Sequence, residues 1–514
     1  MTAGALVIGL DAAEATLLEK WSAEGLLPNI ARLTSQGSVR SLGNSLQTLP
    51  GAIWPEITSG QSGGKIGHFC TVNQIPAGES RYRPVIEDDV DSTSNYWSIA
   101  SRAGLRVAAI DQVQCGIDPH LNGIEIIEWG CHDRNFRTAS QPPALLDEVN
   151  AKYGPYPVQS CDSYPKNHQG YIQLLEDLLD GVRRKTSLLL DLLGREEWDL
   201  FTCSFGESHC AGHQLWRFHD LDSEYHDASA PTILKDALAS VYAEIDKGIG
   251  ELIDANGDAG TVLVFASHGM GRYIGGYQLI PEILSRLGMS SDAGKAGDSR
   301  IRQLQDWMKK YVPMGFVPFF ESKLSRLKLL QHLQGWYGGM IFPLDSPKTR
   351  AVFVPNNRVG AIRLNIKGRE PNGCLEPGVE VAQVVDELKR ELMALRHVGS
   401  GEPIVERVFT ADEVFGRDHH PGIPDVMVVF STDLGRIDSC RSERVGVIRQ
   451  DIHNVRMTRT GDHTPESRLW MLGQNVPTGA RLADASVLDL APEILGLLGV
   501  PVPQEMDGKR LDTA

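Results

Sequence analysis

Ala5-Leu-Val-Ile-Gly-Leu-Asp11 is the stretch that decides the fold, because it is an uninterrupted apolar run that ends in a carboxylate. Such a short run is typical of a strand that is buried on both faces of a parallel sheet. In an open α/β sheet, ligands bind at the carboxyl ends of the strands. Asp11 is therefore expected at the edge of the sheet where function resides.

Three further segments carry His or Asp in or just after an apolar or turn-like run. They are Leu200 to His213, which contains His209 and His213, Val262 to Gly269, which contains His268, and Gly461-Asp462-His463. Imidazole and carboxylate groups gathered at one edge of a sheet suit a divalent transition metal such as zinc or manganese. The pattern predicts a metal-dependent enzyme.

The composition of the 514-residue chain is ordinary for a soluble globular protein. Its formal net charge of -16 argues against nucleic acid polymers and anionic membranes as partners. A small anionic substrate stays possible, because a bound metal sets the sign of the field in its own pocket. The sequence contains no run of about 18 uncharged apolar residues, so no membrane span is expected. The run before Asp11 lacks a basic segment and is too short for a signal peptide.

The cysteines are dispersed along the chain, at Cys70, Cys115, Cys131, Cys161, Cys203, Cys210, Cys374 and Cys440. None of them forms a CxxC pair, so zinc-finger and thioredoxin-like sites are excluded. Dispersed thiols without an export signal predict a reducing compartment, the cytoplasm. The sequence does not predict the oligomeric state.

Strand-like and helical segments alternate over the first part of the chain. Strands are expected at 5–11, 107–111, 123–129, near Ser204 and at 261–266, and helices at 14–25, 27–33, 170–193 and 236–255. This alternation predicts a mostly parallel sheet and hence an α/β fold. We assign residues 1–275 to the first part of a catalytic α/β core.

Residues 276–345 interrupt the alternation with basic and aromatic residues in helical spacing. We expect a helical insertion there, either a cap or a peripheral helical pair without a catalytic part. Strand signals resume at 351–354 and 361–366, a last strand is expected at 469–472 and a closing helix at 487–498. Residues 346–514 are accordingly assigned to the second part of the core.

A set of motifs in a fixed order resembles a known family. The motifs are Gly-Leu-Asp11 after a strand, Leu27-Pro-Asn-Ile-Ala-Arg-Leu33, Trp54, Ser59-Gly60, the His209/His213 pair, Ser267-His268-Gly269, and Ile362 to Glu370 before Gly378. Together they resemble the type I phosphodiesterase/nucleotide pyrophosphatase branch of the alkaline phosphatase superfamily, with 276–345 uncovered. The resemblance implies a central, mostly parallel sheet flanked by helices. It also implies two metal ions, usually zinc, and hydrolysis through a phospho-Thr or phospho-Ser intermediate.

The resemblance further implies which residues hold the metal ions. One ion would be bound by Asp11 and His268, and the other by His213 and His463. Zinc is the expected metal and manganese the alternative, with one or two ions per chain.

Two ligand positions depart from the pattern of the family. The family's Asp-x-x-x-His reads His209-x-x-x-His213 here, and its Asp-His-Gly reads Ser267-His268-Gly269. An imidazole in place of a carboxylate removes a negative charge and keeps a nitrogen donor. His209, His213 and His463 then make a three-His set, which is a usual arrangement for catalytic zinc with room for water.

The position of the nucleophile also departs from the pattern of the family. Alignment on Trp54 and Ser59-Gly60 puts Pro50 where the family has Thr or Ser, and Thr48 lies two residues earlier. Thr48 could serve only if the loop has been rebuilt. The sequence thus leaves two hypotheses, a nucleophilic Thr48 beside the metal or a water molecule that the metal activates.

Other polar residues near the expected strand ends are weaker candidates. His209 and His213 are four residues apart, so a helix would place both rings on one face. Glu207 could be a ligand or base that compensates for the lost carboxylate, or it could only complement the dipole at the start of that helix. Lys65 and His132 are candidate substrate-binding residues, although a polar turn after a strand is the preferred explanation of His132.

Two other functions compete with phosphate ester hydrolysis. A formylglycine-dependent sulfatase would need a Cys-x-Pro-x-Arg type motif, and none of the cysteines lies in one, although sulfate or phosphonate ester cleavage by another route stays open. A ligand-binding relative would explain the altered positions, but it would gain nothing from keeping scattered metal ligands. We therefore expect a metal-dependent hydrolase of small anionic phosphate esters. The resemblance favours phosphodiester or pyrophosphate-type bonds over monoesters.

Overall fold

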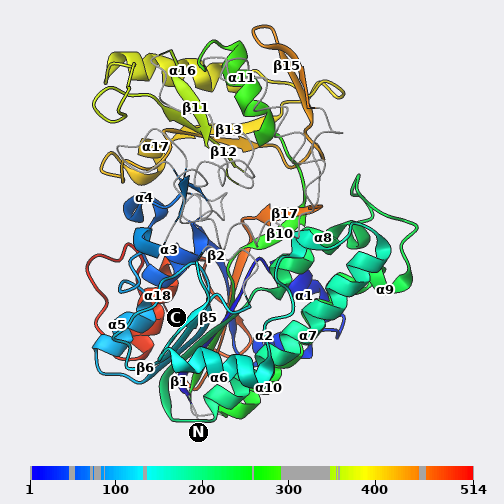
Figure 1. Cartoon of the computed structure of the whole chain (residues 1–514), viewed down its shortest axis with the longest axis vertical. Helices are drawn as coiled ribbons and strands as arrows, with labels where there is room; N and C mark the ends of the chain where they lie inside the picture. The colour runs from blue at the N-terminus through cyan, green and yellow to red at the C-terminus, as the bar shows by residue number, and fades with distance from the viewer. Residues whose placement is uncertain are drawn as a thin grey trace. The chain divides into compact units, whose positions relative to one another are not determined.

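The computed structural model describes residues 3–44, 52–69, 73–74, 83–85, 87–130, 136–257, 260–290, 348–354, 356, 359–450 and 459–512. The chain forms two compact units, which are described separately (Figure 1). The first unit comprises residues 1–71, 86–273 and 457–514, and the second comprises residues 72–85 and 274–456.

A ten-stranded sheet forms the centre of the first unit, in the order β19-β2-β18-β9-β1-β8-β5-β6-β7, with β20 also paired to β2. Its strands are β1 (Ala3–Leu10), β2 (Ser38–Gly43), β5 (Val107–Gln112), β6 (Gly123–Ile127), β7 (Ala139–Gln141), β8 (Trp198–Phe205), β9 (Thr261–Ala266), β18 (Ser467–Leu472), β19 (Ala480–Arg481) and β20 (Ala485–Ser486). The central strands β9, β1, β8, β5 and β6 run parallel, whereas β18 and β7 run antiparallel to their neighbours. The predicted α/β fold with a mostly parallel sheet is confirmed.

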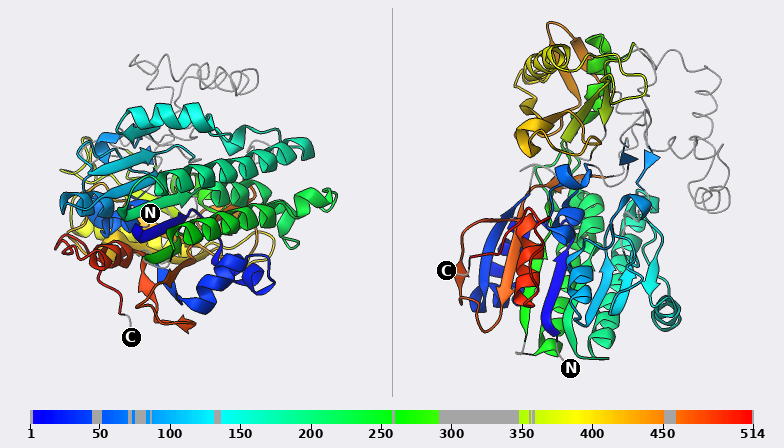
Figure 2. Two further views of the ribbon diagram at one scale, coloured as in Figure 1. Left: turned by 90° about the horizontal axis from the view of Figure 1, so that it is seen from below. Right: turned by 90° about the vertical axis from the view of Figure 1, so that its left-hand side faces the viewer.

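Helices cover both faces of this sheet, which explains why its strands read as continuous apolar runs (Figure 2). Leu6, Ile8 and Leu10 of β1 enter one core, and Ala5 and Val7 enter the other. The first core is covered by α1 (Ala15–Ala23), α2 (Pro28–Gln36), α6 (Ala144–Tyr153), α7 (His168–Leu193), α8 (Glu207–His219), α9 (Thr232–Lys235) and α10 (Ala237–Asn256). The second core is covered by α3 (Ile53–Ser59), α5 (Tyr96–Arg102) and α18 (Leu490–Leu497).

The pairing register brings three strand ends to one level. In the parallel ladders, Leu10 at the end of β1 stands opposite Phe205 of β8 and Ala266 of β9. Asp11, helix α8 and Ser267-His268 therefore all begin at the same edge of the sheet. A small antiparallel pair adds His463 there, because β10 (Gly269–Arg272) pairs with β17 (Gly461–Thr464) and sets Met270 opposite His463.

The second unit is built on a four-stranded antiparallel sheet in the order β11-β12-β14-β13. Its elements include β11 (Ala351–Val354), β12 (Val359–Leu364), β13 (Val405–Thr410), β14 (Val426–Phe430), the hairpin of β15 (Ser439–Ser442) and β16 (Gly446–Arg449), and the helices α11 (Ile280–Arg286), α16 (Val379–Met393) and α17 (Ala411–Phe415). The sheet, α11 and α16 enclose a separate apolar core that includes Ile283, Ile362 and Leu388.

This second unit differs from the division that we expected. Of residues 346–514, only 457–514 cluster with the large sheet, and 274–456 belong to the second unit. Hydrophobic periodicity identifies a strand but does not say which sheet the strand joins, so it cannot separate β11 and β12 from the strands of the core. Within the expected insertion at 276–345, residues 277–286 form a 3₁₀ turn and α11, and 291–345 lie outside the described residues. The strand expected last is β18, and the two-residue strands β19 and β20 follow it.

In the part of the chain that the structure describes, no helix combines the length and apolarity needed to cross a membrane.

Candidate metal centre

Asp11 is fixed at the end of β1 by contacts with the two neighbouring strand ends. Its backbone N–H donates to Phe205 O at 2.9 Å, and its carbonyl accepts a bond of 2.6 Å from Ser208 Oγ. The next residue, Ala12, has a φ of 50° and turns the chain away from the sheet. The Asp11 side chain is consequently buried against the start of α8.

His209 and His213 lie on one buried face of α8, as the spacing of four residues predicted. The segment before His463 packs directly on this helix, because Thr460 N donates to His213 O at 2.8 Å. A Cβ on Gly461 would lie 2.2 Å from Gly212 O, so the close approach needs glycine at position 461. These contacts bring imidazoles from distant parts of the sequence together.

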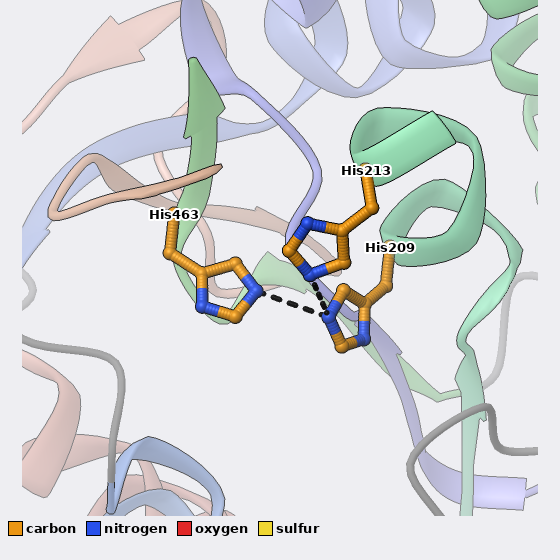
Figure 3. A group of neighbouring side chains, drawn as sticks. All are labelled: His209, His213 and His463. Atoms are coloured by element: carbon orange, nitrogen blue, oxygen red, sulfur yellow. Dashed lines mark hydrogen bonds between the residues drawn. The ribbon is translucent and has the colours of Figure 1, made fainter. Parts of the chain in front are cut away.

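The imidazoles of His209, His213 and His463 face one another (Figure 3). His209 Nε2 lies 2.8 Å from His213 Nε2 and 3.0 Å from His463 Nε2. All three side chains are buried, and one ligand atom from each lies within 4.8 Å of the others. The group could therefore hold a metal ion.

The partners of the other ring nitrogens fix the protonation of this group. His213 Nδ1 lies 2.9 Å from Gly461 O, and a carbonyl only accepts, so Nδ1 carries the hydrogen. His209 Nδ1 lies 2.9 Å from Asp11 Oδ2, which as a carboxylate also only accepts. The Nε2 atoms of neutral His209 and His213 are then two lone pairs that face each other at 2.8 Å. A cation between the two nitrogens would satisfy both lone pairs.

A proton and a metal ion are two cations small enough to lie between the rings. One proton on His209 Nε2 can bridge to His213 or to His463, but not to both at once. A metal ion accepts all three lone pairs, and oxygen-bound Nδ1–H groups are the usual partners of metal-binding histidines. The residues present thus fit a divalent ion bound through three Nε2 atoms.

Asp11 has the contacts of a carboxylate that orients a histidine. Its Oδ1 accepts a bond of 2.7 Å from Trp54 Nε1 and a bond of 3.4 Å from Ser267 Oγ, while Oδ2 accepts from His209. Burial alone would raise its pKa, but the neighbouring His209 and His268 and the hydrogen bonds from His209 and Trp54 bring that pKa to about 2. Asp11 is therefore ionised at neutral pH.

His268 lies next to the three-His group without belonging to it. Its ring centroid is 4.6 Å from that of His463, and its Nδ1 lies 3.0 Å from Ser267 Oγ and 4.0 Å from Asp11 Oδ1. Burial lowers the pKa of His268 to about 4, so the ring is neutral at pH 7. Its buried Nε2 has no hydrogen-bond partner among the residues described. That His268 and Asp11 together hold a second ion stays a prediction.

Glu207 is paired with residues outside the three-His group. Lys185 Nζ lies 3.1 Å from its Oε1 and 3.2 Å from its Oε2, and Tyr156 OH donates to Oε1 at 2.6 Å. Lys185 also lies 2.8 Å from Asp111 Oδ2. These contacts favour a structural role over the predicted role of ligand or base.

The remaining predicted residues lie elsewhere or outside the described part of the chain. Lys65, on α4 (Gly63–Ile66), contacts Asp507 at 3.2 Å and the carbonyl of Glu505 in the C-terminal segment. Thr48, Pro50 and His132 fall outside the described residues, so their roles stay predictions.

Sequence reasoning missed Arg459, which lies beside the group. Its Nη1 is 3.4 Å from His213 Nε2, and its Nε and Nη2 contact Asp162, with Nη2 at 2.8 Å from Oδ2. The only signal was its position four residues before His463, because the Asp162 partner is 297 residues away.

Comparison with known proteins identifies the family. The sequence model for type I phosphodiesterase/nucleotide pyrophosphatase matches residues 5–435. A search of curated proteins finds no match.

Several solved structures are similar over nearly the whole chain. Human ectonucleotide pyrophosphatase/phosphodiesterase 5 is 11% identical, with a TM-score of 0.48, and the match covers 99% of this chain and 97% of that chain. The murine counterpart is 11% identical, with a TM-score of 0.47 and coverages of 98% and 96%. Phosphonoacetate hydrolase from Sinorhizobium meliloti, in complex with phosphonoformate, is 13% identical, with a TM-score of 0.49 and coverages of 97% and 95%.

The sequence match covers most of the chain and agrees with the resemblance of its ordered motifs. The chain therefore belongs to the type I phosphodiesterase/nucleotide pyrophosphatase family of the alkaline phosphatase superfamily.

Proposed function

We propose that this protein is a metal-dependent hydrolase of small phosphate esters, with phosphodiester or pyrophosphate-type bonds preferred over monoesters. The observation that carries the proposal is the convergence of three Nε2 atoms, 2.8 and 3.0 Å apart, on one buried point. The family's members act on esters of this kind, and the preference for diesters rests on that membership alone. Zinc is the proposed metal, because neutral imidazoles are common zinc ligands.

Each residue of the centre has a distinct role in this proposal. His209, His213 and His463 bind the ion, Asp11 holds His209 through its Nδ1–H, and Gly461 O holds His213 in the same way. A divalent ion supplies a Lewis acid that activates a nucleophile and stabilises negative charge on the ester. The nucleophile is a water molecule or Thr48. His268 is neutral and buried beside His463.

The test is metal content measured together with turnover on nitrophenyl mono- and diesters. The wild-type protein should bind zinc and cleave the diester faster than the monoester. His213→Ala should lose both the metal and the turnover, because two remaining imidazoles bind zinc far more weakly than three. Trapping of a phospho-enzyme would favour Thr48 over water.

A histidine on the same helix provides the matched control. His219 ends α8 and packs against the rings of Trp21 and Trp216, away from the group. His219→Ala should keep metal and activity. Full activity in His213→Ala, or zinc binding without any ester cleavage in the wild type, would contradict the proposed function.

We also propose a cytoplasmic location, on the ground that the cysteines are dispersed. Cys115, Cys203, Cys374 and Cys440 are free thiols in the structure.

A further inference from the structure

The first unit contains a polar cavity of about 180 Å³ that shares no residue with the three-His group. The cavity lies between α3, the short helix α4 and the segments that precede α5 and follow β5. Gln114, two residues after β5, contributes to its wall at the carboxyl edge of the sheet, where ligands bind in α/β folds. A water molecule needs only about 10–15 Å³ of such space, so the cavity has room for a small organic ligand.

Gln114 has two features that are common in ligand-binding residues. Its backbone is left-handed, with a φ of 56°, a conformation that is unfavourable outside glycine and is often found at binding sites. Its backbone N–H donates to Glu128 Oε1 at 2.9 Å, which helps to hold this conformation. Its side-chain Oε1 is buried and has no hydrogen-bond partner among the described residues. Because a buried acceptor without a donor is unfavourable, a donor from a ligand would stabilise it.

Carboxylates set the charge of the cavity. Asp89 and Asp91 contribute to its wall, and none of the described residues in the wall is lysine or arginine. Asp91 Oδ1 accepts bonds from Thr93 N at 2.9 Å and from Thr93 Oγ1 at 2.7 Å, and Asp91 forms no ion pair within the described part of the chain. A wall of this charge attracts a cation and repels phosphate and other anions.

The other groups of the wall suit a ligand with hydroxyl groups. Thr58, Ser94 and Asn95 supply hydroxyl and amide groups, which can both donate and accept hydrogen bonds. None of the described residues in the wall is Phe, Tyr or Trp, so the cavity offers no such ring for an aromatic ligand to stack on. These features favour a compact, hydroxylated cation over a flat aromatic one.

We propose that this cavity binds a small primary ammonium ion that carries hydroxyl groups, that is, an amino alcohol. Its ammonium group donates to Gln114 Oε1 and is attracted by Asp91, and its hydroxyl groups bond to the hydroxyl and amide groups of the wall. The inference goes beyond the proposed function and does not depend on it, because no residue of the wall belongs to the three-His group.

The test compares two ligands of nearly equal size by NMR titration of the full-length protein. Serinol is the amino alcohol in which an amine replaces the central hydroxyl group of glycerol, and it is a cation at neutral pH. Serinol should bind at least about tenfold more tightly than glycerol, because hydrogen bonds from charged groups are stronger than those between neutral groups.

Two variants test the residues that select the ammonium group. Gln114→Met removes the acceptor and nearly keeps the length of the side chain, so serinol affinity should fall about tenfold. Asp91→Asn removes a charge and keeps the oxygen that accepts from Thr93, so the turn is retained. Because Asp91 is exposed, this change should lower the preference for serinol over glycerol by only about threefold.

Asp227→Asn is the matched control. Asp227 Oδ1 makes the same pair of contacts with a residue two positions ahead, at 3.1 Å from Ser229 N and 2.6 Å from Ser229 Oγ, and Asp227 does not contribute to the cavity wall. Serinol affinity in this variant should equal that of the wild type.

The outcomes separate this inference from the proposed function. Serinol binding no tighter than glycerol binding, or an unchanged preference in both cavity variants, would overturn the inference. Serinol binding that requires zinc would also overturn it, because the amine would then be a metal ligand. His213→Ala should keep the serinol affinity of the wild type, so a failure of the metal centre leaves this inference intact.

Discussion

Helix α8 takes part in two buried polar clusters that differ in how their charges are balanced. In the first, Lys185 lies between the carboxylates of Asp111 and Glu207, and Tyr156 and the backbone N–H of Gly130 complete the hydrogen bonds. In the second, which begins at His209, the Nε2 atoms of three imidazoles face one another. The first cluster is complete within the protein, whereas the second presents three nitrogens that could hold a metal ion.

The two clusters show how a structural cluster differs from a candidate binding site. Burial is common to both, since Lys185, Glu207, His209 and His213 are all buried. What separates them is their chemistry, because the first cluster combines opposite charges and the second gathers three imidazoles. Burial alone would lower the pKa of Lys185, but Asp111 and Glu207 raise it well above its usual value, so the cation is permanent. The second cluster instead gathers three imidazoles, whose Nε2 atoms are ligands of the kind that zinc accepts.

Loss of the cation from the complete cluster should have the largest effect on stability. Lys185→Met leaves two buried carboxylates without a positive partner, which typically costs about 3–5 kcal/mol. Denaturant unfolding measures this cost. Lys152→Met is the control, because Lys152 pairs with Asp191 on the surface, and its removal should leave the stability nearly unchanged. Equal stability of the two variants would contradict the distinction drawn between the clusters.

A buried carboxylate without a cation should make stability depend on pH. Glu125 accepts bonds of 2.8 Å from Trp97 Nε1 and from the backbone N–H of Asp118, and burial raises its pKa from 4.5 to about 7. A raised pKa favours the protonated form in the folded state, so this contribution to stability is complete below pH 4.5 and is lost as the pH rises through about 7. The full change is on the order of 3 kcal/mol.

Glu125→Gln isolates this titration because glutamine does not ionise. Between pH 5 and pH 8, the unfolding free energy of the wild type should fall relative to that of the variant. A difference that stays constant over that range would show that Glu125 does not titrate as described.

A smaller effect is expected when the support of one imidazole is altered. In Asp11→Asn, the amide oxygen should stay with Trp54 Nε1, so the NH₂ group faces His209 Nδ1. His209 would then accept at Nδ1 and carry its hydrogen on Nε2, so metal binding would first require a change of tautomer. Zinc affinity should fall by about 10–100-fold, as for other partners of metal-binding histidines. Isothermal titration with zinc measures the change.

Ser267→Ala is the control for that variant, because it keeps the contact between Asp11 and His209. If Asp11 instead holds a second ion with His268, Asp11→Asn would lower the number of zinc ions from two to one and leave the affinity of the first site unchanged. That result would contradict the orienting role of Asp11.

The sequence predicted those parts of the fold and site that depend on local pattern. The apolar runs located β1, β8 and β9, and the rule for strand ends placed Asp11 and His268 at one edge of the sheet. The spacing of His209 and His213 predicted that both lie on one face of a helix. These inferences need only the periodicity of a strand or a helix.

Features that depend on pairing over long sequence distances could not be predicted. Glu207 and Lys185 meet because α7 packs beside α8, and the sequence of neither helix indicates which residue it will contact. Arg459 and Asp162 are brought together in the same way. The assignment of β11 and β12 to a second sheet also required knowledge of strand pairing, which periodicity does not contain.

The central claim is that three imidazoles bind one divalent metal ion through Nε2. The most direct measurement is zinc stoichiometry together with X-ray absorption spectroscopy on the zinc-loaded protein. We predict at least one tightly bound zinc per chain, with three imidazole nitrogens at about 2.0–2.1 Å. A protein that binds no zinc, or binds it without imidazole ligands, would contradict the account.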